Sequence, residues 1–109
     1  MQFDNHPPVN FDNSEKLAKA SRDGGCYDNV GWDTYTVFQG GKIHLVHSYN
    51  SGCDYGSGTT TNRAHLGIFG TREELVAFLV SKTDGGSDDV PQWAANELLE
   101  QLGYSGVEA

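Results

Sequence analysis

The chain has 109 residues, the size of one small domain, and its formal net charge at pH 7 is −8. Seven Lys and Arg against fifteen Asp and Glu exclude a dense basic track, so we expect no direct binding to nucleic acid or to an anionic membrane. No stretch reaches the roughly 18 apolar residues of a membrane span, and the first residues lack the pattern of a secretory signal. We therefore expect a cytoplasmic domain in which Cys26 and Cys53 are reduced.

The first twelve residues predict a flexible arm. Pro7 and Pro8 block regular structure there, because proline fixes φ and has no amide hydrogen. Three apolar residues are placed to tether the arm to the domain: Phe3, Val9 and Phe11.

A short helix is predicted next, from a cap at Asn13 or Ser14 to about Arg22, with Gly24 and Gly25 ending it. This helix has few apolar residues, so we expect it to be weakly anchored to the core. They are Leu17, Ala18 and Ala20.

The clearest signal is a β-hairpin formed by two runs of β-branched and aromatic residues, 32–39 and 42–49. Gly40 and Gly41 separate the runs and tolerate the positive φ of a two-residue turn, which pairs Phe38 with Ile43. By apolar count, the core face is predicted to carry Trp32, Thr34, Thr36, Phe38, Ile43, Leu45, His47 and Tyr49. The second face then carries Asp33, Tyr35, Val37, His44, Val46 and Ser48.

Residues 50–62 are the longest irregular stretch, and their glycines predict a loop, although the Thr run near its end can begin a strand. Residues 63–69 alternate well enough to predict a third strand, with Ala64, Leu66 and Ile68 on one face. This strand is expected to join the hairpin, because two strands alone are marginally stable in water.

A helix is predicted to start after Thr71, where a capping box is formed with Glu74. The Thr71 hydroxyl can accept from the amide of Glu74, whose carboxylate reaches back to the amide of Thr71. The helix is expected to end at Asp84. Its apolar residues are Leu75, Val76, Phe78, Leu79 and Val80.

A second helix is predicted from a cap at Asp89, with Pro91 in its first turn and Gly103 as its end. An apolar stripe at helical spacing marks the buried side of this helix. The stripe consists of Ala94, Ala95, Leu98, Leu99 and Leu102.

These elements predict a single α+β domain over residues 13–109, preceded by the arm over 1–12. The sheet is expected to have three antiparallel strands, from the hairpin 32–49 and the strand 63–69. Two C-terminal amphipathic helices and the short N-terminal helix are expected to pack with it. No internal repeat and no second domain boundary are predicted.

Metal-ligand residue types gather between positions 44 and 65, but their placement argues against a metal site. A zinc site needs three or four ligands that converge at about 2.0–2.3 Å. His44 and His47 are three apart on a predicted strand and therefore project from opposite faces. No metal site, no catalytic residue set and no cofactor is predicted.

A lone nucleophile offers an alternative interpretation. Cys53 lies in the predicted loop, and His47 or His65 would serve as its base. Asp54 beside the thiol disfavours the thiolate, and no family signature surrounds the cysteine. A small enzyme or ligand-binding domain that uses loop 50–62 therefore remains the second hypothesis.

The acids fall into two groups. Those in predicted first helical turns, such as Glu73 and Asp89, are explained by the helix macrodipole. Glu97 and Glu100 on one face of the last helix have no such explanation. Neither has Asp33, which borders the second sheet face. That face is expected either to be covered, by the first helix or the arm, or to form an interface.

The predicted partner-binding residues combine these acids with neighbouring aromatic side chains. They are Asp33, Tyr35, Asp54, Tyr55, Glu97 and Glu100. In size, acidity, lack of a catalytic motif and layout, the chain resembles the small inhibitors that phages encode against bacterial defence systems, anti-CRISPR proteins among them. The resemblance implies a non-catalytic protein that occupies a basic, nucleic-acid-binding surface of a larger protein partner. A structural protein that oligomerises through its sheet face is the third hypothesis.

Overall fold

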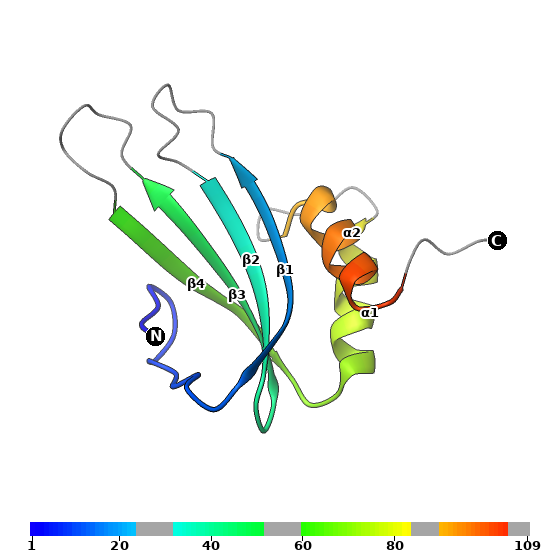
Figure 1. The fold of residues 1–109 in the computed structure, drawn as a ribbon, viewed down its shortest axis with the longest axis horizontal. Helices are drawn as coiled ribbons and strands as arrows, with labels where there is room; N and C mark the ends of the chain where they lie inside the picture. The colour runs from blue at the N-terminus through cyan, green and yellow to red at the C-terminus, as the bar shows by residue number, and fades with distance from the viewer. Residues whose placement is uncertain (24–31, 52–59, 84–89, 105–109) are drawn as a thin grey trace.

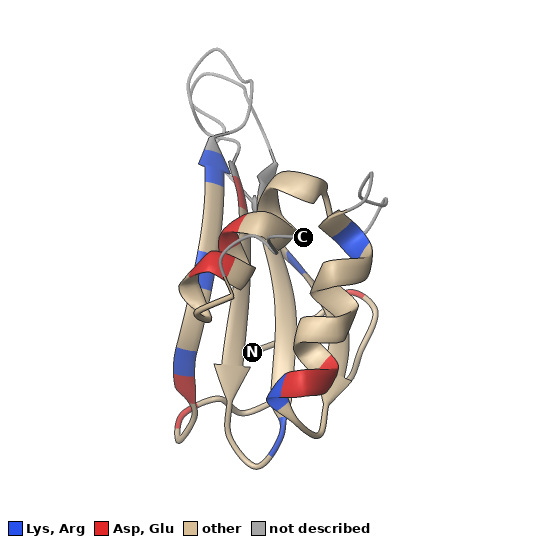
Figure 2. Ribbon diagram, turned by 90° about the vertical axis from the view of Figure 1, so that its right-hand side faces the viewer, with Lys and Arg blue, Asp and Glu red and all other residues tan. Residues whose placement is uncertain are grey.

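The computed structural model describes residues 1–23, 32–51, 60–83 and 90–104. It is an α+β fold in which four antiparallel strands form a sheet in the order β1-β2-β3-β4. Two helices lie side by side over one face of this sheet (Figures 1 and 2). The elements are β1 (Glu15–Asp23), β2 (Trp32–Gln39), β3 (Ile43–Ser51), β4 (Thr60–Phe69), α1 (Arg72–Thr83) and α2 (Gln92–Gln101). Neither helix has both the length and the apolar character that a membrane crossing requires.

The predicted N-terminal helix is wrong, because its residues form the edge strand β1 and make the sheet four-stranded. Residues such as Ala and Lys favour helix by only tenths of a kcal/mol each, which pairing with β2 outweighs. Ala18 and Ala20 are buried against Val37 and Tyr35, their neighbours on β2. The small alanine side chains leave room for α2 to pack directly on β1, and Leu17 is accommodated in a β-bulge.

The hairpin between β2 and β3 is confirmed, but its predicted register is wrong by one residue. Gln39 pairs with Ile43, and Phe38 pairs with His44. The connection therefore has three residues, 40–42, and neither glycine adopts a positive φ. The longer connection replaces the two-residue turn that would have required positive φ at both positions.

The register shift exchanges the two faces of β2 relative to β3, because side chains alternate along a strand. Tyr35 and Val37 join Ile43 and Leu45 on the face that the helices cover, and all four are buried. The predicted core residues Thr34, Thr36 and Phe38 instead face away from the helices, as do His44 and Val46. We call this second side the outer face.

The strand predicted over 63–69 is confirmed as the greater part of β4, which begins within the Thr run. Its predicted face is wrong because a β-bulge interrupts the pairing opposite Leu45 and Val46. Ala64 pairs with His47 on the helix side, whereas Ile68 pairs with His44 on the outer face and is 45% exposed.

Both predicted helices are confirmed. The Thr71 hydroxyl accepts a hydrogen bond from the amide of Glu74 at 3.2 Å. The Glu74 carboxylate accepts from the amide of Gly70 at 2.9 Å, one residue earlier than predicted. Gly103 ends α2 with a φ of +92°, a conformation that glycine adopts without strain. The predicted start of α2 is wrong, because its N-cap is Pro91, which is extended and precedes the first turn, and not Asp89, which lies outside the described residues.

The core lies between the sheet and the helices. From α1 it contains Leu75 and Leu79, and from α2 it contains the predicted stripe except Leu102, which is partly buried and packs against it. The N-terminal residues 1–11 lie on the opposite side of the sheet from the helices (Figure 1). Ring contacts of Phe11 with Phe38 and His44 join them to the outer face.

Candidate functional site

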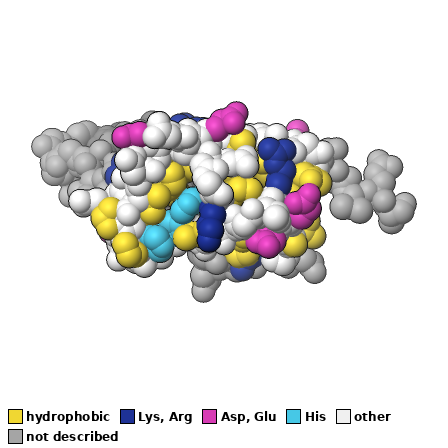
Figure 3. Space-filling model, turned by 90° about the horizontal axis from the view of Figure 1, so that it is seen from below, with side chains coloured by type: hydrophobic (Ala, Val, Ile, Leu, Met, Phe, Trp, Pro, Cys, Tyr) yellow, Lys and Arg dark blue, Asp and Glu magenta, His cyan; other side chains and the backbone are white. Residues whose placement is uncertain are grey.

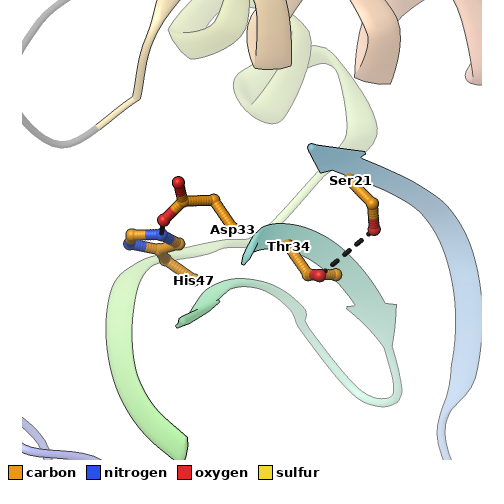
Figure 4. A network of polar contacts seen from close by, with 4 residues as sticks. All are labelled: Ser21, Asp33, Thr34 and His47. Carbon is orange, nitrogen blue, oxygen red and sulfur yellow. Dashed lines mark hydrogen bonds and ion pairs between the residues drawn. The ribbon is translucent and has the colours of Figure 1, made fainter. Parts of the chain in front are cut away.

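The helix side of the sheet carries a histidine–carboxylate pair. His47 on β3 donates from Nε2 to Oδ1 of Asp33 on β2 at 2.9 Å (Figure 4). The imidazole is stacked on the ring of Tyr35, with centroids 4.2 Å apart and planes 1° apart. Trp93 at the start of α2 meets the same tyrosine edge-on, at 5.7 Å. These contacts hold the imidazole in one orientation against Asp33.

His47 contacts two of the predicted partner-binding residues, Asp33 and Tyr35, and these two have different roles. The side chain of Asp33 is 46% exposed and is available to a partner. Tyr35 is only 4% exposed, so its ring supports His47 from within the core. The sequence assigned Tyr35 to an uncovered or loosely covered face because the predicted register was one residue off.

A polar row crosses the outer face at the same level as this pair. The hydroxyl groups of Ser21 and Thr34 are hydrogen-bonded at 3.1 Å (Figure 4). Thr34 pairs with Ser48, which in turn pairs with Arg63 on β4. These four residues include no carboxylate.

A second cluster lies on the outer face, where three imidazoles meet. His44 Nδ1 and His65 Nε2 are 2.9 Å apart, so one of the two nitrogens carries the shared hydrogen. The ring of His6 is stacked on His65 with centroids 4.1 Å apart. In Figure 3, histidine side chains lie next to one another and are bordered by hydrophobic side chains. We call His6, His44 and His65 the histidine cluster.

The surroundings of the cluster disfavour positive charge on His44 and His65. Burial, with the charges of His6 and His44, lowers the pKa of His65 to about 4. Burial also lowers the pKa of His44, and His6 and Lys42 contribute further. His44 and His65 therefore stay neutral at pH 7.

The histidine cluster does not have the geometry of a metal centre. Nitrogen lone pairs lie in the ring plane, and stacked rings direct them along parallel planes rather than to one point. The Nδ1 of His6 also donates to the carbonyl of Pro7 at 2.7 Å. Among the described residues, no group of three or more metal-ligand side chains is arranged to hold an ion.

The sequence placed His44 and His47 on opposite faces, which is confirmed, but it did not identify the cluster. His65 is among the metal-ligand residue types between positions 44 and 65 and is a candidate base for Cys53, whereas His6 belongs to the predicted arm. His47 and His65 lie on opposite sides of the sheet, so they do not converge. No periodicity connects residues 6, 44 and 65, because the arm returns to the sheet only in the tertiary structure.

The remaining predicted partner-binding residues lie elsewhere. Glu97 and Glu100 occupy successive turns of α2, the first partly exposed and the second exposed. They are separate from Asp33, which lies on the sheet. Asp54 and Tyr55 lie outside the described residues, as does Cys53.

The Lys and Arg side chains and the carboxylates of the described framework make different kinds of contact. Three cations lie over aromatic rings: Lys16 over Phe38, Arg22 over Trp93 and Lys82 over Phe78. Among the described residues, the single carboxylate with an ion-pair partner is Asp33, and that partner is a histidine. Figure 2 shows the acids of α2 and the cations of β1 side by side. Within the described framework no ion pair joins these two groups, so the carboxylates of α2 lie near the β1 cations without direct contact.

Comparison of the chain with protein-family models, with curated proteins and with solved structures found no match.

Proposed function

We propose that this domain is a non-catalytic binding protein whose carboxylates occupy a basic surface of a larger protein. The observation that carries the proposal is that the carboxylates of α2 are not paired with Lys or Arg in the described part of the chain. Within the described framework, three of the seven Lys and Arg lie over aromatic rings, while Glu97 and Glu100 have no Lys or Arg ion-pair partner. An unpaired carboxylate at the surface retains its field and contributes to attraction of a basic partner.

The distribution of acid along the sequence supports the same function. All seven Lys and Arg belong to the described framework. The remaining segments contain acids and no Lys or Arg. These acids are Asp28, Asp54, Asp84, Asp88, Asp89 and Glu108. Segments 24–31 and 52–59 join strands at the same end of the sheet, because Asp23 pairs with Trp32 and Ser51 pairs with Thr60.

The finer part of the proposal concerns the partner. A protein surface that binds nucleic-acid phosphates carries the dense Lys and Arg that an acidic domain complements. The domain would then act as an inhibitor by competing with nucleic acid for that surface, in the manner of the anti-CRISPR-like inhibitors it resembles. Such competition requires no catalytic group.

Affinity capture from a host lysate, with the full chain as bait, tests this proposal. Basic nucleic-acid-binding proteins should be enriched and released by raising the salt concentration, since salt screens charge within about 8–10 Å. With the purified partner, the association rate should fall as salt rises. The domain should also displace labelled nucleic acid from that partner.

Two matched variants locate the contact. Glu97→Lys with Glu100→Lys changes the charge of α2, and Asp12→Lys with Glu15→Lys makes the same change at the start of β1. We expect the α2 variant to slow association more than the β1 variant. Equal effects would mean that net charge alone acts, and salt-insensitive binding would contradict the proposal.

One observation favours a second candidate function. His47 is oriented by Asp33, and Cys53 follows the end of β3 by two residues. A nucleophile, a base and an orienting carboxylate form the usual set for acyl transfer. Under the proposed function, Cys53→Ser and His47→Gln leave partner binding intact. Loss of activity in both, with an unchanged circular dichroism spectrum, would support the enzymatic alternative.

A further inference from the structure

The N-terminal residues cover the free edge of β4. The carboxamide of Asn5 makes two hydrogen bonds to the backbone of His65. Its Nδ2 donates to the carbonyl at 2.9 Å, and its Oδ1 accepts from the amide at 2.8 Å. The amide of Asp4 donates to the carbonyl of Arg63 at 2.9 Å. These bonds occupy backbone groups that an edge strand otherwise offers to another chain.

The same residues cover the outer face with rings. Phe3 meets His65 edge-on at 5.2 Å, and Phe11 is stacked on Phe38 at 4.3 Å. His6 is stacked on His65, and with these contacts His65 is only 7% exposed. The side-chain hydroxyl and the amide of Ser14 both donate to the carbonyl of Phe11, which fixes the turn into β1.

Docking of these residues depends on neutral imidazoles. If His44 and His65 were both protonated, two N–H groups would face each other across 2.9 Å. A charged His6 stacked on a charged His65 would add repulsion at 4.1 Å between centroids. Uncharged rings allow all three contacts.

We propose that residues 1–11 form a proton-released cover: protonation of the histidine cluster detaches them from the outer face and exposes the edge of β4. The inference is independent of the proposed binding function. It concerns a conformational device that uses the cluster, whereas the proposed function uses the carboxylates.

The sign follows from the pKa values. Burial, with the charges of His6 and His44, lowers the pKa of His65 from 6.5 to about 4, and the cover supplies His6 and part of that burial, so the docked state binds protons less readily than the released state. Docking is therefore at full strength above about pH 6.5 and weakens as the pH falls toward 4. At pH 5, this histidine alone favours release by at most about 30-fold, the value for loss of the whole shift. His44, whose pKa is also lowered, adds to the effect.

The charges around the cluster reinforce this direction. The groups that act on one another are His6 on the cover, His44 on β3 and His65 on β4. Lys42, at the hairpin, acts on His44. Asp4 and Arg63 are the neighbouring charged residues at the β4 edge, and neither is among the main causes of the two shifts. On β2, the nearest partner of the cover is the uncharged Phe38, with Lys16 over its ring.

Nuclear magnetic resonance of the labelled full chain, titrated from pH 7.5 to 4.5, tests the proposal. We expect amides of residues 1–11 to gain mobility and the Asn5 carboxamide signals to shift between pH 6.5 and 4.5. These changes should track the imidazole signals of His65 and His44. Signals of Leu45 and Leu98 should report an intact core across the same range.

His65→Gln removes the main titrating group, and His6→Phe keeps the stacked ring without its charge. Both should move release to lower pH, and the second serves if the first fails to fold. His47→Gln, on the helix side, should leave the transition in place. Residues 1–11 that stay rigid while His65 is protonated would overturn the proposal, as would release in both variants at the wild-type pH.

Discussion

Each edge of the sheet is closed by a side-chain carboxamide that makes two backbone hydrogen bonds, but the two carboxamides belong to different parts of the fold. At the β1 edge, the Gln101 side chain accepts from the amide of Lys19 at 2.8 Å and donates to its carbonyl at 2.5 Å. At the β4 edge, Asn5 makes the equivalent pair of bonds to His65. Each carboxamide takes the place of one residue of a neighbouring strand, which blunts the edge against association.

The difference lies in what holds each carboxamide. Gln101 ends α2, a helix anchored by residues such as Leu98 that are fully buried in the core. Asn5 belongs to a segment held on the outer face by ring stacking and neutral histidines. The β1 edge should therefore open only when the core unfolds, whereas the β4 edge should open locally.

The largest effect is expected from loosening the support of the β1 edge. Leu98→Ala should lower the free energy of unfolding by about 2–5 kcal/mol, because it leaves a cavity between α2 and the sheet. Leu45→Ala should cost a similar amount. Ile68→Ala, at the exposed side of β4, is the control and should cost less than about 1 kcal/mol. Urea denaturation measures all three, and wild-type stability in the first two would refute the assigned core.

An intermediate effect is expected from the carboxamides themselves. Gln101→Ala should lower the free energy of global unfolding by about 1–2 kcal/mol, for two lost hydrogen bonds. Asn5→Ala should change global unfolding by less than about 0.5 kcal/mol and instead speed hydrogen exchange at the His65 amide. Gln101→Glu and Asn5→Asp keep an acceptor but remove the donor to each carbonyl. Equal global losses at the two edges would contradict the comparison.

A smaller effect is expected at the start of α1, the helix that follows β4. Thr71→Ala removes the acceptor for the Glu74 amide and should cost about 1 kcal/mol. Glu73→Lys should cost about 0.3–1 kcal/mol, because it places positive charge at the helix N-terminus. Thermal unfolding followed by circular dichroism measures both changes. Thr71→Ser, which keeps the hydroxyl, should retain most of the stability.

The smallest effect on stability is expected from the acids of α2. Glu97→Lys with Glu100→Lys should change the free energy of unfolding by less than about 0.5 kcal/mol, since neither carboxylate has a Lys or Arg partner within the described framework. The β1 edge should stay closed, with slow exchange at the Lys19 amide. Faster exchange there would show that these acids help to hold α2 in place.

The elements that the sequence predicted well are those whose signals are local. A capping box involves residues three apart, and the stripe from Ala94 to Leu99 repeats within one helix. Gly103 ends α2 because its positive φ satisfies carbonyls of the same helix. Each of these features can be found in a short window of sequence.

The elements that were missed depend on partners far along the chain. β1 forms because β2 and α2 are available to it, although its own residues favour helix slightly. The register of the hairpin is decided by burial of Tyr35 and Val37 under the helices and not by the glycine pair at its tip.

By itself, the sequence determined that this protein is an acidic α+β domain with a hairpin, a further strand and two C-terminal helices. Short-range periodicity and capping chemistry are sufficient for those conclusions. Only the tertiary structure decided which face of β2 is core, which side chains close the sheet edges, and which histidines meet. Those outcomes join residues as distant as His6 and His65, and only the shared burial of the folded chain selects among such pairings.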